Sequence, residues 1–253
     1  MSNRRRFRIS LLLGMAAIGL AAGGAAAATP PPELTETELF FELNHTDEDL
    51  GIHASIDGGP YTRLVIEDPK GREIFSLAAR GRLAKQGLTQ LFFESAEPSF
   101  DELDPEDFFL RFPEGEYEIE ASRNGKEVEA TVELSHVLAA PPSNIEINGT
   151  PAAEDCDAVP LPSVSEPVVI DWDPVTQSHP EIGDPGDGSV EIDRYQLFVE
   201  QGDVKFAVDL PPTATEFEVP AEITQTGGTF KFEIIARTSE LNNTAVESCF
   251  IVP

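Results

Sequence analysis

The sequence predicts an all-β protein made of two tandem β-sandwich domains behind an N-terminal export signal. Short runs of β-branched and aromatic residues alternate with clusters of Gly, Pro, Asn and Asp about every ten residues, a spacing typical of sandwiches and barrels. The first residues have the basic, apolar and small-residue regions of a signal peptide. Without them roughly 225 residues remain, enough for one large domain or two of ordinary size.

Export is predicted from residues 1–28. Four arginines lie within residues 4–8, an apolar stretch covers residues 9–22, and the alanines at 26–28 offer a cleavage site before Thr29. The Arg-Arg-x-Phe sequence at the start also fits a twin-arginine signal, so the Sec and the twin-arginine routes both agree with it. We expect a bacterial, extracytoplasmic protein, secreted or periplasmic, with no membrane span after cleavage; an uncleaved anchor helix is the alternative.

The net charge narrows the classes of partner. The full chain carries 17 basic and 46 acidic residues, a net charge of −29. Removing the four arginines of the signal leaves 13 bases against 46 acids, or −33. Nucleic acids and anionic membrane surfaces would repel such a chain, whereas divalent cations or a salty environment would suit it.

The first domain is predicted over residues 34–138, after a linker at 29–33. Alternating apolar residues bounded by turn residues predict its early strands, and a capping pattern predicts its one short helix. The helix begins after Asp104 and ends near Arg111, and its phenylalanines are expected to pack on the sandwich. The strand candidates are residues 39–43, 52–56, 64–67, 74–77 and 91–94.

The end of this domain carries a family resemblance. Pro113, Gly115 and Tyr117 lead into a strand, Asn124-Gly125 is a strong hairpin signal, and an alternating strand returns. This hairpin resembles the last two strands of bacterial immunoglobulin-like sandwiches. The Ala-Ala-Pro-Pro stretch at 139–142 is predicted to be a short, stiff linker.

The second domain is predicted over residues 143–253. Trp172 follows an apolar run, and residues 192–197 and 215–219 are strand candidates. They resemble strands B, C and E of fibronectin type III domains, in which strand B carries a tryptophan. Residues 228–236 resemble the strand-F run, with Phe230 where the family usually has tyrosine. Alternation in that run predicts an inward-facing core, with Trp172 as its central plate.

The two cysteines are expected to form a disulfide. Cys156 and Cys249 are an even pair in an oxidising compartment, 93 residues apart. A closed loop of that length stabilises by roughly 4 to 5 kcal/mol in the chain-entropy model.

Candidate sites are few, and we find no catalytic motif in the sequence. Closely spaced acids in a turn can converge on Ca²⁺, which makes Asp47 and Asp49 the candidate metal ligands; an Asp-rich turn without metal is the alternative. Alternation places His53 toward solvent, and His136 and His179 have no recognisable partners.

The sequence therefore predicts an exported, non-enzymatic binding protein without an obligatory cofactor, which contacts a protein or glycan partner through its loops. The alternatives are a structural spacer or accessory module of an envelope complex, and an enzyme with an unrecognised site.

Overall fold

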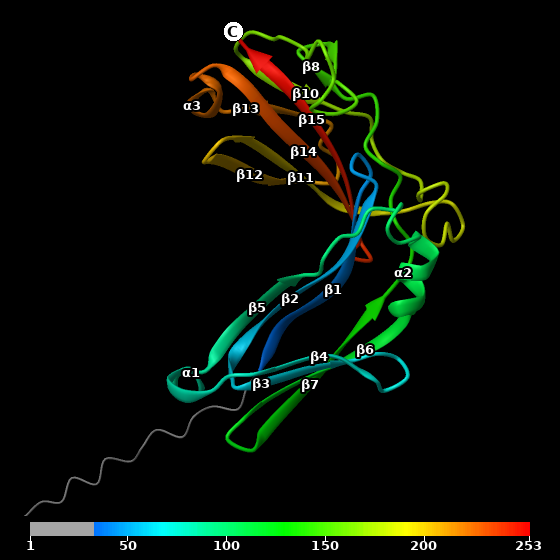
Figure 1. Cartoon of the computed structure of the whole chain (residues 1–253), viewed down its shortest axis with the longest axis vertical. Helices are drawn as coiled ribbons and strands as arrows, with labels where there is room; N and C mark the ends of the chain where they lie inside the picture. Colours follow the sequence, from blue (N-terminus) through cyan, green and yellow to red (C-terminus); the bar gives the residue numbers. More distant parts are fainter. Residues whose placement is uncertain (1–32) are drawn as a thin grey trace, which may run out of the picture. The chain divides into compact units, whose positions relative to one another are not determined.

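The computed structural model describes residues 33–253, which lie within one compact unit (Figure 1). The predicted signal peptide and all but the last residue of the predicted 29–33 linker lie outside the described residues.

The first sandwich contains two layers. One layer has the order β5-β2-β1 and the other β4-β3-β6-β7. Alternate residues of each strand face the space between them, where Phe41, Ile56, Leu64 and Ile119 are fully buried. The strands are β1 (Leu34–Asn44), β2 (Asp49–Tyr61), β3 (Arg63–Glu67), β4 (Glu73–Ala78), β5 (Leu88–Glu94), β6 (Gly115–Arg123) and β7 (Lys126–Leu134).

The second sandwich has its own core. Its layers are β13-β10-β8-β9 and β12-β11-β14-β15. Phe230, Phe232 and Ile234 face inward as predicted, and Trp172 is only 3% exposed, with its ring 5.4 Å from that of Tyr195. The strands are β8 (Glu146–Ile147), β9 (Thr150–Pro151), β10 (Val168–Asp171), β11 (Ile192–Gln201), β12 (Val204–Leu210), β13 (Glu216–Val219), β14 (Gly228–Thr238) and β15 (Asn243–Val252).

Both sandwiches follow one topology. We leave out β9 as a short addition and number the remaining strands of each sandwich from 1 in chain order. In both sandwiches one layer then has the strand order 5-2-1 and the other has the order 4-3-6-7. This is the strand order of fibronectin type III and immunoglobulin-like sandwiches. The sequence prediction of two tandem sandwiches of this class is confirmed.

The two sandwiches also share a sheet, which the sequence did not predict. Strand β1 of the first pairs in parallel with β15 of the second, with Glu42 opposite Asn243 and Asn44 opposite Ala245. The result is one seven-stranded sheet in the order β12-β11-β14-β15-β1-β2-β5 (Figure 1). Each edge strand thereby satisfies backbone groups of the other that an isolated edge would expose.

Within residues 33–253, three short helices accompany the strands. Helix α2 (Pro105–Arg111) is the predicted one: the Asp104 side chain accepts a hydrogen bond from the Glu106 amide, and Phe108 and Phe109 are buried. Helix α1 (Gly81–Gln86) also lies in the first sandwich, so the prediction of a single helix there was wrong. Its sequence has no capping side chain and no buried residue. Helix α3 (Ala221–Thr224) is one turn in the second sandwich.

Residues 139–142, predicted as a linker, are packed and hydrogen-bonded. Ala139 is fully buried, and its carbonyl accepts a 2.9 Å hydrogen bond from the Thr244 hydroxyl. The Ala140 amide donates to the Gln177 carbonyl over 2.8 Å. The connection therefore runs along the second sandwich rather than through solvent.

Candidate functional site

The candidate site lies on the face of the seven-stranded sheet that points away from both cores. On β1, Leu39, Phe41 and Leu43 face the first core, so Phe40 and Glu42 face the other way. The same alternation places His53 of β2 beside Phe40, with ring centroids 5.4 Å apart. The face is crossed by the join between β1 and β15, so it draws residues from both sandwiches.

His53 is buried, which corrects the prediction that it points to solvent. It is 3% exposed, and its Nε2 lies 2.9 Å from Oε1 of Glu97. The predicted alternation was right, because Ile52 and Ala54 face the core. The error was to equate the opposite face with water, since Phe40 and Glu97 cover the ring there.

Glu97 reaches His53 across β2 at a glycine. A Cβ atom built on Gly51 would lie 2.4 Å from Oε1 of Glu97 and 2.7 Å from its Cγ. Only glycine leaves that space open, so the backbone of β2 forms a cradle for the Glu97 side chain. Glu97 follows β5 outside any strand, and no local pattern in the sequence indicates its position.

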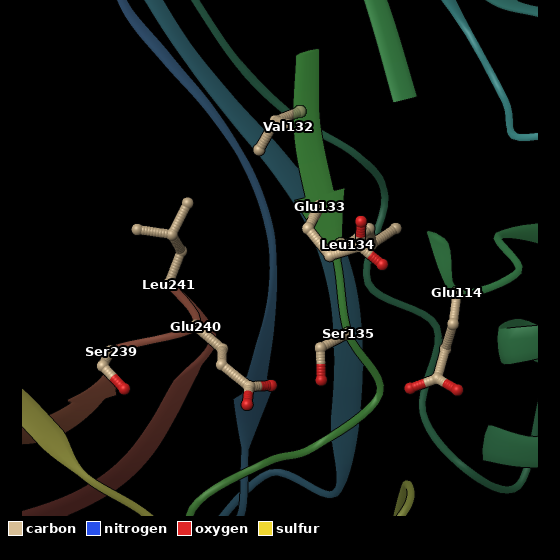
Figure 2. Close-up of a pocket in the computed structure, with 8 residues that line it drawn as sticks. All are labelled: Glu114, Val132, Glu133, Leu134, Ser135, Ser239, Glu240 and Leu241. Carbon is tan, nitrogen blue, oxygen red and sulfur yellow. The ribbon is translucent and has the colours of Figure 1, made fainter. Parts of the chain in front are cut away.

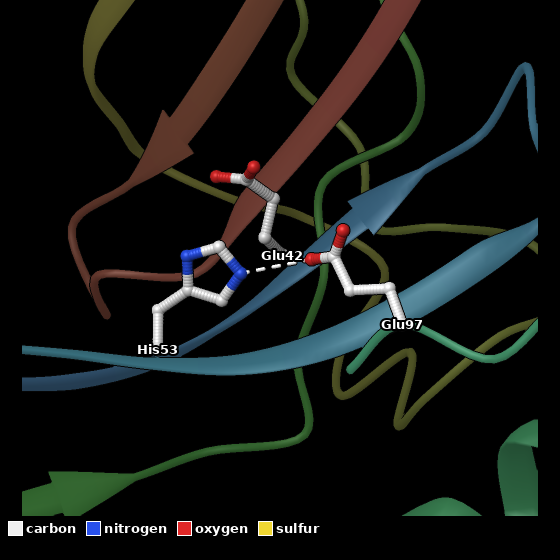
Figure 3. A group of neighbouring side chains, drawn as sticks. All are labelled: Glu42, His53 and Glu97. Carbon is white, nitrogen blue, oxygen red and sulfur yellow. Dashed lines mark hydrogen bonds and ion pairs between the residues drawn. The ribbon is translucent and has the colours of Figure 1, made fainter. Parts of the chain in front are cut away.

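Glu42 completes a group of three. One ligand-type atom each from Glu42, His53 and Glu97 lies within 4.8 Å of the others (Figure 3). The Glu42 carboxylate accepts a 2.7 Å hydrogen bond from Nδ2 of Asn243, a residue of the second sandwich. The join between the sandwiches therefore helps to orient one member of the group.

Further carboxylates crowd the same region. Burial raises the pKa of Glu233 to about 8, and the negative charges of Glu42 and Glu247 add to the shift. Burial also raises the pKa of Asp49 to about 6, with Glu97 as the next cause. The negative charges here repel one another, and a cation would relieve that repulsion.

The nearby cations are engaged in ion pairs. Lys231 pairs with Glu247 across β14 and β15. Arg237 is 2% exposed and lies 2.7 Å from Glu38, with its guanidinium carbon 4.5 Å from the centroid of the Phe40 ring. Burial lowers the pKa of Arg237, although the charge of Glu38 opposes that shift.

The predicted calcium ligands lie at the rim of this region. Asp47 is exposed in the β1–β2 turn, where Nδ2 of Asn44 lies 3.3 Å from its Oδ2 atom. Asp49 is half-buried at the start of β2. Within residues 33–253, the group with ligand atoms close enough for a metal is Glu42, His53 and Glu97, without either aspartate. Calcium binding by Asp47 and Asp49 stays a prediction.

The other histidines also have partners, contrary to expectation. His136 Nε2 lies 2.8 Å from the Phe112 carbonyl. His179 Nε2 lies 3.5 Å from Nδ1 of His45, and the Ile182 amide donates a 2.9 Å hydrogen bond to His179 Nδ1. Burial lowers the pKa of His179, and the neighbouring His45 lowers it further.

Two hollows lie near the join. The first, of about 620 Å³, lies between the end of β7 and the β14–β15 turn, with the carboxylates of Glu114, Glu133 and Glu240 around it (Figure 2). The second, of about 410 Å³, contains His45 and His179. Both are rimmed by acidic side chains, so the negative field extends beyond the central group.

The structure also brings Cys156 and Cys249 together as a disulfide, with Cα atoms 4.8 Å apart. The bridge attaches the segment between β9 and β10 to strand β15. No helix of the described residues is long and apolar enough to cross a membrane.

The site and strand order define a class: two fibronectin type III or immunoglobulin-like sandwiches fused through one sheet, with an acidic centre at the join. No protein-family model matches the chain, and no curated protein sequence matches it.

Solved structures of tandem sandwiches are similar to it. A two-domain fibronectin type III segment of chicken tenascin is 12% identical, covering 87% of this chain and 98% of that one, with a TM-score of 0.29. The ligand-binding domain of human OSCAR is 9% identical over 84% and 97% of the two chains, with a TM-score of 0.26. A bacterial ice-binding adhesin is 8% identical, covering 86% of this chain and 64% of that one, with a TM-score of 0.25. With TM-scores this low, the fold assignment comes from the strand order described above.

Proposed function

We propose that this chain is an exported, non-enzymatic interaction protein that binds a positively charged partner protein on the acidic face of its seven-stranded sheet. The observation that carries the proposal is the crowding of Glu42, Asp49, Glu97 and Glu233 around the join. Carboxylates that raise one another's pKa are held together at a cost in free energy. A partner's lysines or arginines would recover that cost on binding.

The chemistry of the face supports binding rather than catalysis. Its side chains offer negative charge and oxygen and nitrogen lone pairs to a cation. Both cysteines are in the disulfide, so neither supplies a thiolate. The excess of acids over bases also disfavours nucleic acid and anionic lipid as partners.

Two observations support export. The predicted signal at residues 1–28 has the three regions that secretion requires. The disulfide Cys156–Cys249 fits an oxidising compartment. Mass spectrometry of the exported protein should find Thr29 at or near its N-terminus; an extracellular form that retains Met1 would contradict export with cleavage.

Two variants test the contact surface, and at about pH 9, above the raised pKa values of Asp49 and Glu233, they change the charge equally. Asp49→Asn with Glu233→Gln removes two acids from the face, whereas Glu127→Gln with Glu129→Gln removes two exposed acids from β7. The probe is a lysine-rich peptide, titrated at fixed ionic strength. We expect the face variant to bind about fivefold more weakly than wild type and the β7 variant less than about twofold. Equal losses would mean general attraction to an acidic protein and would contradict the proposal.

A structural spacer is the second candidate function. The observation that favours it is the shared sheet, which replaces a free linker with backbone hydrogen bonds such as His45 N–H to the Ala245 carbonyl, 2.9 Å. A spacer needs a fixed distance between its ends rather than an acidic face. Unchanged assembly of the parent envelope complex with the Asp49→Asn, Glu233→Gln variant would favour the spacer.

A further inference from the structure

We propose that Glu42, His53 and Glu97 form a binding site for a divalent transition-metal ion, with Zn²⁺ as the ion that suits the donors. The three side chains come from β1, β2 and the segment after β5, so residues distant in sequence converge on one point (Figure 3). An imidazole nitrogen with two carboxylates is a donor set that zinc accepts, whereas calcium prefers oxygen ligands throughout.

The distances suit such an ion after a small movement. Zinc bonds of about 2.0 to 2.2 Å in a tetrahedron separate neighbouring ligand atoms by roughly 3.4 Å. His53 Nε2 and Glu97 Oε1 are 2.9 Å apart, and the whole group spans no more than 4.8 Å. The metal would take the place of the proton that His53 and Glu97 share. Glu97 is 26% exposed at its side chain, outside any strand, and is therefore the ligand best able to move.

The site is built into the fold. His53 is 3% exposed, so its ring is held by packing against Phe40. Gly51 leaves the space that Glu97 occupies, and any other residue there would displace that carboxylate. Nδ2 of Asn243 holds the Glu42 carboxylate, as hydrogen bonds behind metal ligands commonly do. These features distinguish the group from acids gathered by chance on a charged surface.

The surrounding charge also favours a dication. Glu94 lies opposite His53 in the β2–β5 pairing and adds a negative charge beside the three ligands. The nearest cations, Lys231 and Arg237, are paired with Glu247 and Glu38. A metal ion would therefore meet a negative field with little competition from basic side chains. A buried His53–Glu97 ion pair without metal function is the alternative reading of the same contacts.

Isothermal titration of the exported chain with Zn²⁺, in a buffer that does not chelate metals, tests the site. Glu42→Gln and Glu97→Gln keep side-chain size and remove one ligand each. Glu94→Gln is the matched control, because it removes a charge opposite His53 and no ligand. We expect the two ligand variants to lose at least about tenfold in affinity, and the control less than about threefold.

Selectivity provides the second measurement. Thermal melts at matched ionic strength should show a higher Tm with Zn²⁺ than with Ca²⁺ or Mg²⁺ in wild type and in Glu94→Gln, and no such difference in Glu97→Gln. The proposal is overturned if both ligand variants bind zinc as wild type does, or if zinc binds wild type no more tightly than calcium. A failure of the zinc proposal would not decide the proposed function, because the peptide titration uses other variants and no metal.

Discussion

The backbone amide of Phe41 donates a 2.9 Å hydrogen bond to Oδ1 of Asn242, a residue 201 positions later in the chain. The Nδ2 group of Asn242 donates in turn to the carbonyls of Ser135 and Val137, over 2.8 and 2.9 Å. Asn242 is fully buried, so one side chain satisfies three backbone groups where the two sandwiches meet. An asparagine suits this position because its amide supplies an acceptor and two donors.

Replacing Asn242 with alanine should destabilise the whole protein. The change leaves a buried amide and two carbonyls without their partners, which we expect to cost about 2 to 5 kcal/mol in the free energy of unfolding. Gln196→Ala is the control, because its amide makes one exposed hydrogen bond to Asp209. Urea denaturation measures both. A loss for Asn242→Ala no larger than that for the control would show that the join contributes little.

Glu233 should make stability fall as pH rises from about 4.5 to about 8. Its pKa rises from 4.5 to about 8 in the folded protein, mainly because of burial. The folded state then holds a proton that the unfolded chain releases, so stability is present at low pH and falls as pH rises through about 8.

Glu233→Gln removes that dependence. Between about pH 5 and pH 9 we expect the variant to gain up to about 4 kcal/mol relative to wild type. Glu129→Gln is the control for the loss of a charge, because Glu129 is exposed on β7. Parallel pH profiles for wild type and Glu233→Gln would contradict the assigned burial of this carboxyl.

His179 should act in the opposite direction. Burial, and then the neighbouring His45, lower its pKa below 6.5, while Glu181 raises it. Its Nδ1 accepts the amides of Glu181 and Ile182 in the neutral form, and protonation would remove both acceptor roles. The stability from His179 is therefore full above about pH 6.5 and is lost as pH falls through the lowered pKa.

Histidine-selective NMR titration measures this shift directly. The acids around the same hollow, Glu48, Asp104 and Glu106, remain in place in a His45→Gln variant. Because that variant removes the repulsion from His45, we expect the pKa of His179 to rise. A pKa of His179 that does not move would mean the two rings are not in contact.

The disulfide should stabilise the protein as one unit. Its 93-residue loop gives an expected loss of about 2 to 5 kcal/mol on reduction. Because the sandwiches share a sheet, reductant should lower the temperature of a single calorimetric transition. A Cys156→Ser, Cys249→Ser variant should melt at one temperature with or without reductant. Two transitions, of which only one moves, would indicate independent domains.

The strands and cores were predictable because the patterns that indicate them lie within short stretches of the sequence. Alternation at Phe230, Phe232 and Ile234 faces those side chains inward whatever the rest of the chain does. Trp172 is large and apolar and directly follows strand β10, and the structure buries it as expected. The pairing of Cys156 with Cys249 followed from there being two cysteines in an oxidising compartment.

The join and the site were not predictable from the sequence, because the residues that meet there lie far apart along the chain. Nothing near β1 indicates that its free edge meets β15, two hundred residues later. The outward-facing His53 is buried because Phe40 and Glu97, from other parts of the first sandwich, cover its ring, so alternation alone does not predict its exposure. Glu97 was missed because it lies outside any strand. Gly51, an unexplained glycine within a strand pattern, was the available signal of a close approach.

The central claim is that β1 and β15 form one continuous sheet and so create the acidic face. Native-state hydrogen exchange of the Phe41 and His45 amides tests it most directly, because both donate across the join. We predict that these two amides exchange only on global unfolding, as slowly as the amides inside each sandwich. Rapid exchange of both, with the β1–β2 amides still protected, would contradict the joined sheet and the site that depends on it.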